Sequence, residues 1–164
     1  MKKIVLMGRS EAGKTTLTQA LKGEEIQYKK TQYVNNLDVV IDTPGEYVQT
    51  AGLGSALALY TYEADIVGLL LSATEPFSLY PPCVTACANR EVIGIVTKIN
   101  DREANVHRAA NWLRLAGCKK IFYVDSKKQE GIPELLSYLR EEGDVLPWES
   151  EKKIKNNKNN TNLR

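Results

Sequence analysis

The sequence predicts an α/β protein in which helices cover both faces of a mostly parallel central sheet of five to six strands. Short runs of aliphatic and β-branched residues alternate with longer segments of helical character, which is the pattern of repeated β-α units. A glycine-rich motif also stands between the first apolar run and the first helical segment. The chain has 164 residues, 43% hydrophobic and 26% charged, the size and balance of one domain with a sizeable core. We therefore look for one functional site.

Five apolar runs are expected to form buried strands. They are nearly continuous instead of alternating, which is typical of parallel strands that are covered on both faces. The expected strands span residues 4–7, 39–42, 66–71, 92–96 and 120–124, and residues 30–34 are expected as an edge strand. Helices are expected over residues 14–21, 55–62, 82–89, 103–116 and 132–141.

The composition changes near the C-terminus. Residues 148–164 are rich in asparagine and lysine with almost nothing to bury, so they are predicted to be a disordered tail after a domain of residues 1–147. This tail carries five of the cationic side chains, and with a formal charge of only +2 overall the body offers no footprint for nucleic acid. No stretch approaches the roughly 18 apolar residues of a membrane helix. We expect a cytoplasmic protein that does not insert into membranes.

The strongest motif fits the phosphate-binding loop pattern G-x-x-x-x-G-K-[ST] and lies where that pattern needs to lie, between a strand and a helix. In such a loop main-chain N–H groups face the β-phosphate, and the positive end of the helix points to the same place. Lys14 is expected to bridge β- and γ-oxygens, and the Thr15 hydroxyl to ligate Mg²⁺. The alternative is a turn that merely connects strand and helix. The predicted nucleotide-binding residues here are Gly8, Arg9, Ser10, Glu11, Ala12, Gly13, Lys14, Thr15 and Thr16.

The sequence Asp42-Thr43-Pro44-Gly45 follows the second buried run. A carboxylate that emerges there can reach the Mg²⁺ shell, usually through water, so Asp42 is a predicted metal residue. Gly45 could offer its amide to the γ-phosphate. Taken alone, the same four residues are an ordinary strand-to-turn sequence with proline and glycine as breakers.

Three segments together resemble one family. The order of G-R-S-E-A-G-K-T, K-K-T-Q and D-T-P-G-E-Y is similar to the small Ras-like P-loop proteins of ethanolamine and propanediol utilisation, the EutP/PduV family, over about residues 2–139. The resemblance implies a Ras-like fold, nucleotide hydrolysis with Mg²⁺, and a role around the bacterial microcompartments of these pathways. A microcompartment component or an activating protein is the partner that it implies.

The resemblance also assigns catalytic candidates besides Lys14. Thr31 matches the threonine that closes over Mg²⁺ and the γ-phosphate in Ras-like proteins, although it could be a plain edge-strand residue. Glu46 occupies the position after D-x-x-G where such enzymes often carry a glutamine that orients water. It could orient water or act as a base, repel the γ-phosphate, or be a solvated carboxylate. Arg9 is a candidate arginine finger. Slow turnover that a partner accelerates is expected.

The segment expected to bind the base departs from the guanine-binding pattern N-K-x-D. Lys98 matches, but Thr97 replaces the asparagine and Asn100 stands where the aspartate belongs. An amide offers one acceptor atom where a carboxylate offers two, which could weaken guanine preference by about 1 to 3 kcal/mol. The nucleotide is therefore left open as GTP or ATP. Ser126 and Lys127 resemble a base-contacting S-A-K loop, or form an ordinary turn.

Three functions fit these residues. The first is a GTP- or ATP-hydrolysing switch in which the segments of Thr31 and of residues 46–54 read the nucleotide state and dock a partner. The second is a phosphotransferase that moves the γ-phosphoryl group of ATP to a small acid such as acetate, which the resemblance to a family handling two-carbon metabolites makes plausible. The third is a nucleotide-binding interaction module with negligible turnover.

Overall fold

The computed structural model of the protein describes residues 1–23, 40–42, 55, 57–58 and 62–146. These residues form a sheet of five strands in the order β2-β1-β3-β4-β5, and every neighbouring pair is parallel. The strands are β1 (Ile4–Met7), β2 (Val40–Asp42), β3 (Ile66–Ser72), β4 (Glu91–Thr97) and β5 (Ile121–Tyr123). The five predicted strands are thus confirmed within one or two residues. The edge strand predicted at residues 30–34 lies outside the described residues.

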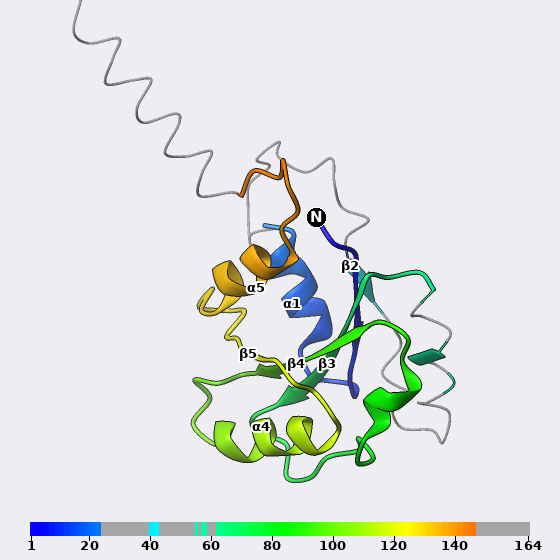
Figure 1. Ribbon diagram of the computed structural model, residues 1–164. Helices are drawn as coiled ribbons and strands as arrows, with labels where there is room; N and C mark the ends of the chain where they lie inside the picture. The colour runs from blue at the N-terminus through cyan, green and yellow to red at the C-terminus, as the bar shows by residue number, and fades with distance from the viewer. Residues whose placement is uncertain (24–39, 43–54, 56, 59–61, 147–164) are drawn as a thin grey trace, which may run out of the picture.

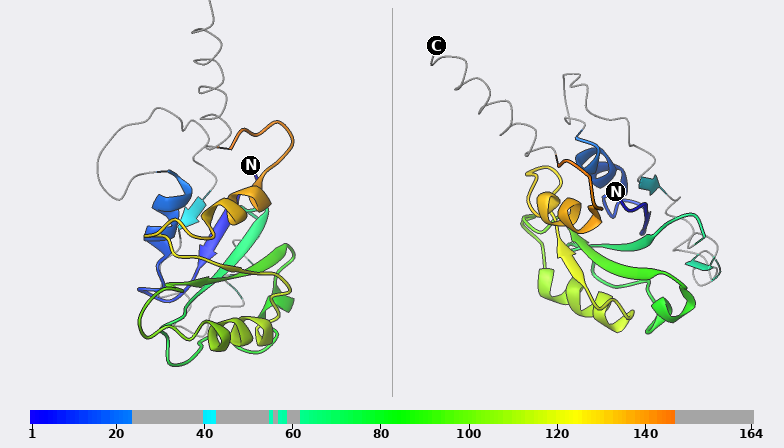
Figure 2. Two further views of the ribbon diagram at one scale, coloured as in Figure 1. Left: turned by 90° about the vertical axis from the view of Figure 1, so that its left-hand side faces the viewer. Right: turned by 45° about the horizontal axis from the view of Figure 1, so that its top comes forward.

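Helices cover both faces of this sheet, as predicted. Helices α1 (Lys14–Leu21) and α5 (Ile132–Leu139) lie on one face, and α4 (Val106–Leu115) lies on the other (Figures 1 and 2). On the first face Leu17 and Leu135 pack in one buried cluster with Ile4. On the second face Leu113 and Val67 belong to a separate buried cluster. Residues of β1 and β3 alternate between the two clusters, which explains why their sequences are apolar without a break.

Two helices are shorter than predicted. Helix α4 begins at Val106 and not at residue 103, because the Asn105 side chain caps it by accepting from the Arg108 N–H at 3.0 Å. Helix α5 ends at Leu139 and not at residue 141, because Arg140 adopts an extended conformation with ψ of 141°. Both ends are set by single residues at the helix boundary.

The helix predicted over residues 82–89 is wrong. The structure has one 3₁₀ turn there, Val84–Cys87, preceded by Cys83 in a left-handed conformation with φ of 58°. Two amides of the segment bond to the end of α4: the N–H of Cys83 donates to the Leu115 carbonyl at 2.9 Å, and the N–H of Thr85 to the Ala116 carbonyl at 3.1 Å. The bonds within the segment, such as that from the Ala86 N–H to the Cys83 carbonyl at 3.0 Å, span only three residues. Tertiary bonds therefore take two of the amides, and the rest form a 3₁₀ turn instead of an α-helix.

The helix predicted over residues 55–62 is only partly described. Ser55, Leu57 and Ala58 are helical, and Tyr62 lies in a turn. The remaining positions of that prediction lie outside the described residues, as do residues 147–164. Within the described residues no helix is long and apolar enough to cross a membrane.

The parallel arrangement brings the loops that follow the strands to one edge of the sheet. The glycine-rich loop follows β1, the segment of Thr74 and Glu75 follows β3, and the loops with Asn100 and Ser126 follow β4 and β5. Ligands of open α/β sheets bind outside the carboxyl ends of their strands. This edge is where the candidate site is built.

Candidate functional site

The glycine-rich loop owes its shape to two glycines. A Cβ on Gly8 would lie 3.0 Å from Leu70 Cβ and 3.1 Å from its carbonyl oxygen, so the loop passes too close to β3 for a side chain. Gly13 has φ of 93°, a left-handed conformation, and precedes the first residue of α1. Glu11 is also left-handed, with φ of 66°. The backbone therefore curls and delivers the N-terminus of α1 to the loop, the end of a helix that favours anions.

Lys14 lies over this curl. Its side chain is largely buried, with a relative exposure of 8%. The ammonium Nζ donates to the carbonyl oxygens of Gly8 at 2.7 Å and Arg9 at 3.0 Å. An ammonium group and a helix N-terminus are thus held at one place, which provides the positive charge that a polyphosphate needs. Thr15, the next residue of α1, is exposed, and Thr16 is half-buried.

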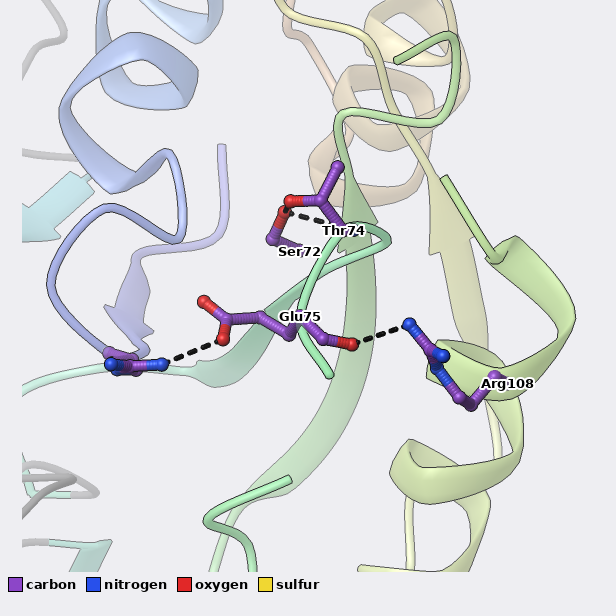
Figure 3. Close-up of polar contacts among 5 residues, drawn as sticks. Ser72, Thr74, Glu75 and Arg108 are labelled. Atoms are coloured by element: carbon purple, nitrogen blue, oxygen red, sulfur yellow. Dashed lines mark hydrogen bonds and ion pairs between the residues drawn. The ribbon is translucent and has the colours of Figure 1, made fainter. Parts of the chain in front are cut away.

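Arg9 points its guanidinium to the segment that follows β3. Its Nη1 forms an ion pair with Glu75 Oε2 at 2.8 Å, and the group lies 5.3 Å from the centre of the Phe77 ring. The main-chain oxygen of the same glutamate accepts from Arg108 Nη2 at 2.7 Å, as Figure 3 shows. Glu75 therefore links α4 to the glycine-rich loop of residues 8–15, the phosphate-type loop. In this structure the side chain proposed as an arginine finger is engaged in that link.

Three hydroxyl groups, those of Ser72, Thr74 and Tyr80, form hydrogen bonds in and beside β1 and β3 next to the loop. Ser72 Oγ and Thr74 Oγ1 lie 2.8 Å apart and shape the turn after β3 (Figure 3). The Tyr80 hydroxyl lies 2.6 Å from the carbonyl oxygen of Leu70 and 3.1 Å from that of Met7. Burial raises the pKa of Tyr80 well above its ordinary value, so the hydroxyl remains a donor at physiological pH. The residue before Gly8 is thereby tied to the neighbouring strand.

Thr97, at the end of β4, bonds to the phosphate-type loop. Its buried Oγ1 donates to the Ala12 carbonyl oxygen at 2.6 Å. The residue that replaces the expected asparagine thus holds the loop in place. Lys98 follows with φ of 54° and an exposed side chain. The structure therefore places the predicted base-binding segment directly beside the predicted phosphate-binding one.

The loop between β5 and α5 is closed by its own side chains. Asp125 Oδ1 accepts from the N–H groups of Lys127 at 3.1 Å and Lys128 at 3.2 Å. Gln129 Nε2 donates to the Ser126 carbonyl oxygen at 3.0 Å. Asp125 and Ser126 are both buried to a relative exposure of 9%. The predicted Ser126 and Lys127 therefore belong to a tightly bonded turn.

One contact joins the loops after β4 and β5. Asn100 Nδ2 donates to Glu130 Oε2 at 2.6 Å. The main chains of Glu130 and Asp125 also bond to each other in both directions, at 3.0 and 3.1 Å. Neither Glu130 nor Glu75 was among the predicted site residues, because each acquires its role from a partner distant in sequence. Only the structure reveals these pairs.

Part of the predicted site lies outside the described residues. Thr31, Gly45 and Glu46 belong to that part. Asp42 is the last residue of β2, paired in register with Leu6 of β1, while its side chain is also outside the described residues. Among the predicted residues, the structure brings together Gly8–Thr15, the Thr97 segment and the Ser126 loop.

The family is decided by sequence. The profile of a protein family described as "Ethanolamine utilisation - propanediol utilisation", PduV-EutP, matches residues 1–141. The chain belongs to this family. The resemblance carried by the three short segments is thereby confirmed, and the PduV-EutP family and the fold together support a P-loop nucleotide-binding protein associated with propanediol or ethanolamine utilisation.

Curated relatives agree with this membership of the PduV-EutP family. The chain is 41% identical over 140 residues to the "Propanediol utilization protein PduV" of Citrobacter freundii, covering 85% of this chain and 93% of that protein. It is 30% identical over 142 residues to the "Probable acetate kinase EutP" of Escherichia coli, covering 85% and 89%. Among solved structures, the FeoB G-domain from Methanococcus jannaschii superposes with a TM-score of 0.58 at 22% identity, over 84% of this chain and 94% of that one. The likeness confirms the Ras-like P-loop fold.

Proposed function

We propose that this protein binds a nucleoside triphosphate with Mg²⁺ and hydrolyses it slowly, as a switch or accessory factor in ethanolamine or propanediol utilisation. The observation that carries the proposal is the position of Lys14 over the carbonyls of Gly8 and Arg9, at the N-terminus of α1. That arrangement concentrates donors and positive charge where a triphosphate would lie. We further propose that the protein works in the cytoplasm, in contact with a microcompartment component or an activating protein.

Oxygen ligands for Mg²⁺ fit the chain. Thr15 is exposed in the first turn of α1, and Asp42 ends β2 beside the last residues of β1. A hydroxyl and a carboxylate are hard oxygen ligands that Mg²⁺ accepts. Thr15 would hold the ion directly, Asp42 through its outer shell, and Thr31 from the segment outside the described residues. When bound, the ion would neutralise charge on the β- and γ-phosphate oxygens.

The chain's own residues then account for slow hydrolysis. The loop amides and Lys14 would stabilise the negative charge that develops on the bridging oxygen between the β- and γ-phosphates. Glu46 would orient the attacking water as an acceptor. Because Arg9 is paired with Glu75, a second positive charge at the γ-phosphate would have to come from an activating partner.

A second candidate is transfer of the γ-phosphoryl group from ATP to a small acid such as acetate. What favours it is that the relatives from Escherichia coli and Salmonella typhimurium, both 30% identical to this chain, are named probable acetate kinases. A carboxylate oxygen of the acid would attack the γ-phosphorus, and ADP would leave with the bridging oxygen. The phosphate loop would serve both reactions alike.

One experiment separates these functions. The full chain is incubated with Mg²⁺ and either GTP or ATP, with and without acetate, and free phosphate and acetyl phosphate are measured. Free phosphate supports the hydrolase, acetyl phosphate supports the kinase, and tight binding without either product supports an interaction module. Absence of heat on titration with both nucleotides would refute nucleotide binding altogether.

The matched variants are Lys14→Ala and Lys22→Ala. Lys14→Ala should weaken triphosphate binding by roughly 100-fold, since charge-assisted hydrogen bonds contribute about 1.5 to 3 kcal/mol each. Lys22 lies just beyond the other end of α1, so its replacement removes the same charge away from the loop. Equal affinities for the two variants would exclude the loop as the binding site.

A further inference from the structure

The Asn100–Glu130 pair lies at the place where the base of a nucleotide would be read. Asn100 follows β4 and Glu130 follows β5, so both belong to the edge of the sheet that carries the phosphate-type loop. The bond from Thr97 to the Ala12 carbonyl fixes the start of the Asn100 loop against the phosphate-type loop. A base attached to phosphates at Lys14 would therefore meet the two loops that this pair connects.

The chemistry of Glu130 determines how the amide of Asn100 is turned. An ionised carboxylate only accepts hydrogen bonds, so the group that faces it across 2.6 Å has to be the NH₂ of the amide. The usual ambiguity between the oxygen and nitrogen of an asparagine is removed by that partner. The amide oxygen of Asn100 is consequently the atom that remains to face a ligand.

The backbone of Glu130 is held in place. It exchanges two hydrogen bonds with Asp125, at 3.0 and 3.1 Å, and the next residue, Gly131, is left-handed with φ of 72°. A Cβ on Gly131 would lie 1.9 Å from the Tyr123 carbonyl oxygen, so the backbone passes directly against β5. The fold therefore fixes the backbone position from which the Glu130 side chain reaches Asn100.

We propose that Glu130 is a positioning residue for nucleotide specificity: it turns the Asn100 amide so that its oxygen faces the base, which makes the site prefer guanine over adenine. This inference rests on the proposed nucleotide binding. Guanine presents N1–H and an exocyclic NH₂ to such an acceptor, whereas adenine presents the bare N1, a second acceptor. An acceptor that meets an acceptor leaves both unsatisfied, and we expect a preference for GTP of roughly tenfold.

The decisive variant is Glu130→Lys, because an ammonium group only donates. The amide of Asn100 should then turn its oxygen to the lysine and present its NH₂ to the base. The ratio of GTP to ATP affinity should fall at least to unity. The extra positive charge should strengthen binding of both triphosphates alike and so leave the ratio to report the amide alone.

A second substitution tests the direction of the effect. Adding Asn100→Asp to Glu130→Lys supplies a carboxylate that accepts from the lysine with one oxygen and keeps another acceptor for the base. The double variant should regain the preference for GTP. Asn100→Asp alone places two carboxylates together, and their repulsion should spoil the geometry and give no gain over the unaltered chain.

The control is Glu134→Lys, which makes the same charge change at an exposed position of α5. Affinities for GTP and ATP are measured by calorimetry on the full chain with Mg²⁺, and thermal unfolding is recorded alongside. Glu134→Lys should leave the ratio unchanged. Should Glu130→Lys fail to fold, Glu130→Gln, whose amide can accept or donate, should reduce the ratio part of the way.

The outcomes are distinguishable from failure of the proposed function. If the unaltered chain binds neither triphosphate, the nucleotide site itself is wrong. If it binds both and the ratio is the same in the chain, Glu130→Lys and Glu130→Gln, the role of Glu130 is wrong while the site stands. A preference for ATP in the unaltered chain would also overturn the inference.

Discussion

The phosphate end and the base end of the candidate site are built by different means. At the phosphate end one continuous stretch, Gly8–Thr15, supplies the backbone curl, the helix terminus and the ammonium group. At the base end two loops that are 30 residues apart in sequence meet through the side chains of Asn100 and Glu130. A site made from one segment leaves a pattern in the sequence, whereas a site made from a pair of distant side chains does not.

The difference extends to how the two ends are fixed. The phosphate-type loop is held by buried contacts from its surroundings, chiefly the bond from the Tyr80 hydroxyl to the Met7 carbonyl and the bond from the Thr97 hydroxyl to the Ala12 carbonyl. The base-end loop is held largely by bonds within itself, from Asp125 to the residues that follow it. The effects of a substitution in a strand should therefore reach the loop at the phosphate end. At the base end the effects should remain within the loop, except where its backbone contacts a strand.

Gly131 is that exception and should give the largest effect. Both Gly131→Ala and Gly13→Ala place a side chain in a left-handed conformation, which costs about 1 to 2 kcal/mol. Only at Gly131 would the new Cβ also collide with a backbone oxygen, 1.9 Å away on Tyr123. We expect Gly131→Ala to lower the free energy of unfolding by at least about 3 kcal/mol, clearly more than Gly13→Ala. Urea denaturation of both variants measures this, and equal losses would contradict it.

The bond between the two ends comes next. Thr97→Val keeps the shape but removes the hydroxyl that donates to the Ala12 oxygen, and it should lower the free energy of unfolding by about 1 to 3 kcal/mol. Thr97→Ser retains the hydroxyl and is the control. Triphosphate affinity should fall in Thr97→Val only. An affinity that is unaltered while stability falls would separate the bond from the site.

The ion pair between Arg9 and Glu75 should give the smallest effect. The arginine side chain is 40% exposed, so solvent screens the pair, and Glu75→Gln should change the free energy of unfolding by no more than about 1 kcal/mol. The loss should shrink further in high salt. Because the substitution releases Arg9 from the pair, nucleotide turnover should rise modestly. An unchanged turnover would show that the pair with Glu75 is not what keeps Arg9 from the phosphates.

Much of the fold could be predicted from the sequence, because its signals are local. Continuous apolar runs such as residues 66–71 indicated buried parallel strands, and the spacing of Gly8, Gly13 and Lys14 indicated the phosphate-type loop. The late start of α4 also had a local signal, since asparagine is a favoured N-cap and Asn105 stands at the boundary. The residues that were missed had no such signal.

Tertiary contacts decided the rest. The amides of Cys83 and Thr85 bond to the end of α4. No property of residues 82–89 alone predicts these bonds. In the sequence, Glu75 and Glu130 cannot be distinguished from ordinary surface carboxylates. Their partners Arg9 and Asn100 lie beside them only in the folded chain. In each case the physical reason is that partner choice depends on the topology of the sheet and not on neighbours in the chain.

The hydroxyl of Thr97 has a thermodynamic consequence. Its hydrogen bond to Ala12 connects the loop that would hold the phosphates of an elongated ligand with the segment that would hold its other end. If one half of the ligand stiffens this hydrogen bond when it binds, the affinity of the protein for the other half rises. Coupling free energies are reciprocal, so each half raises the affinity for the other by the same factor. The two halves of the ligand, added together as separate molecules, should therefore bind with positive cooperativity. Loss of the Thr97 hydroxyl should abolish that cooperativity.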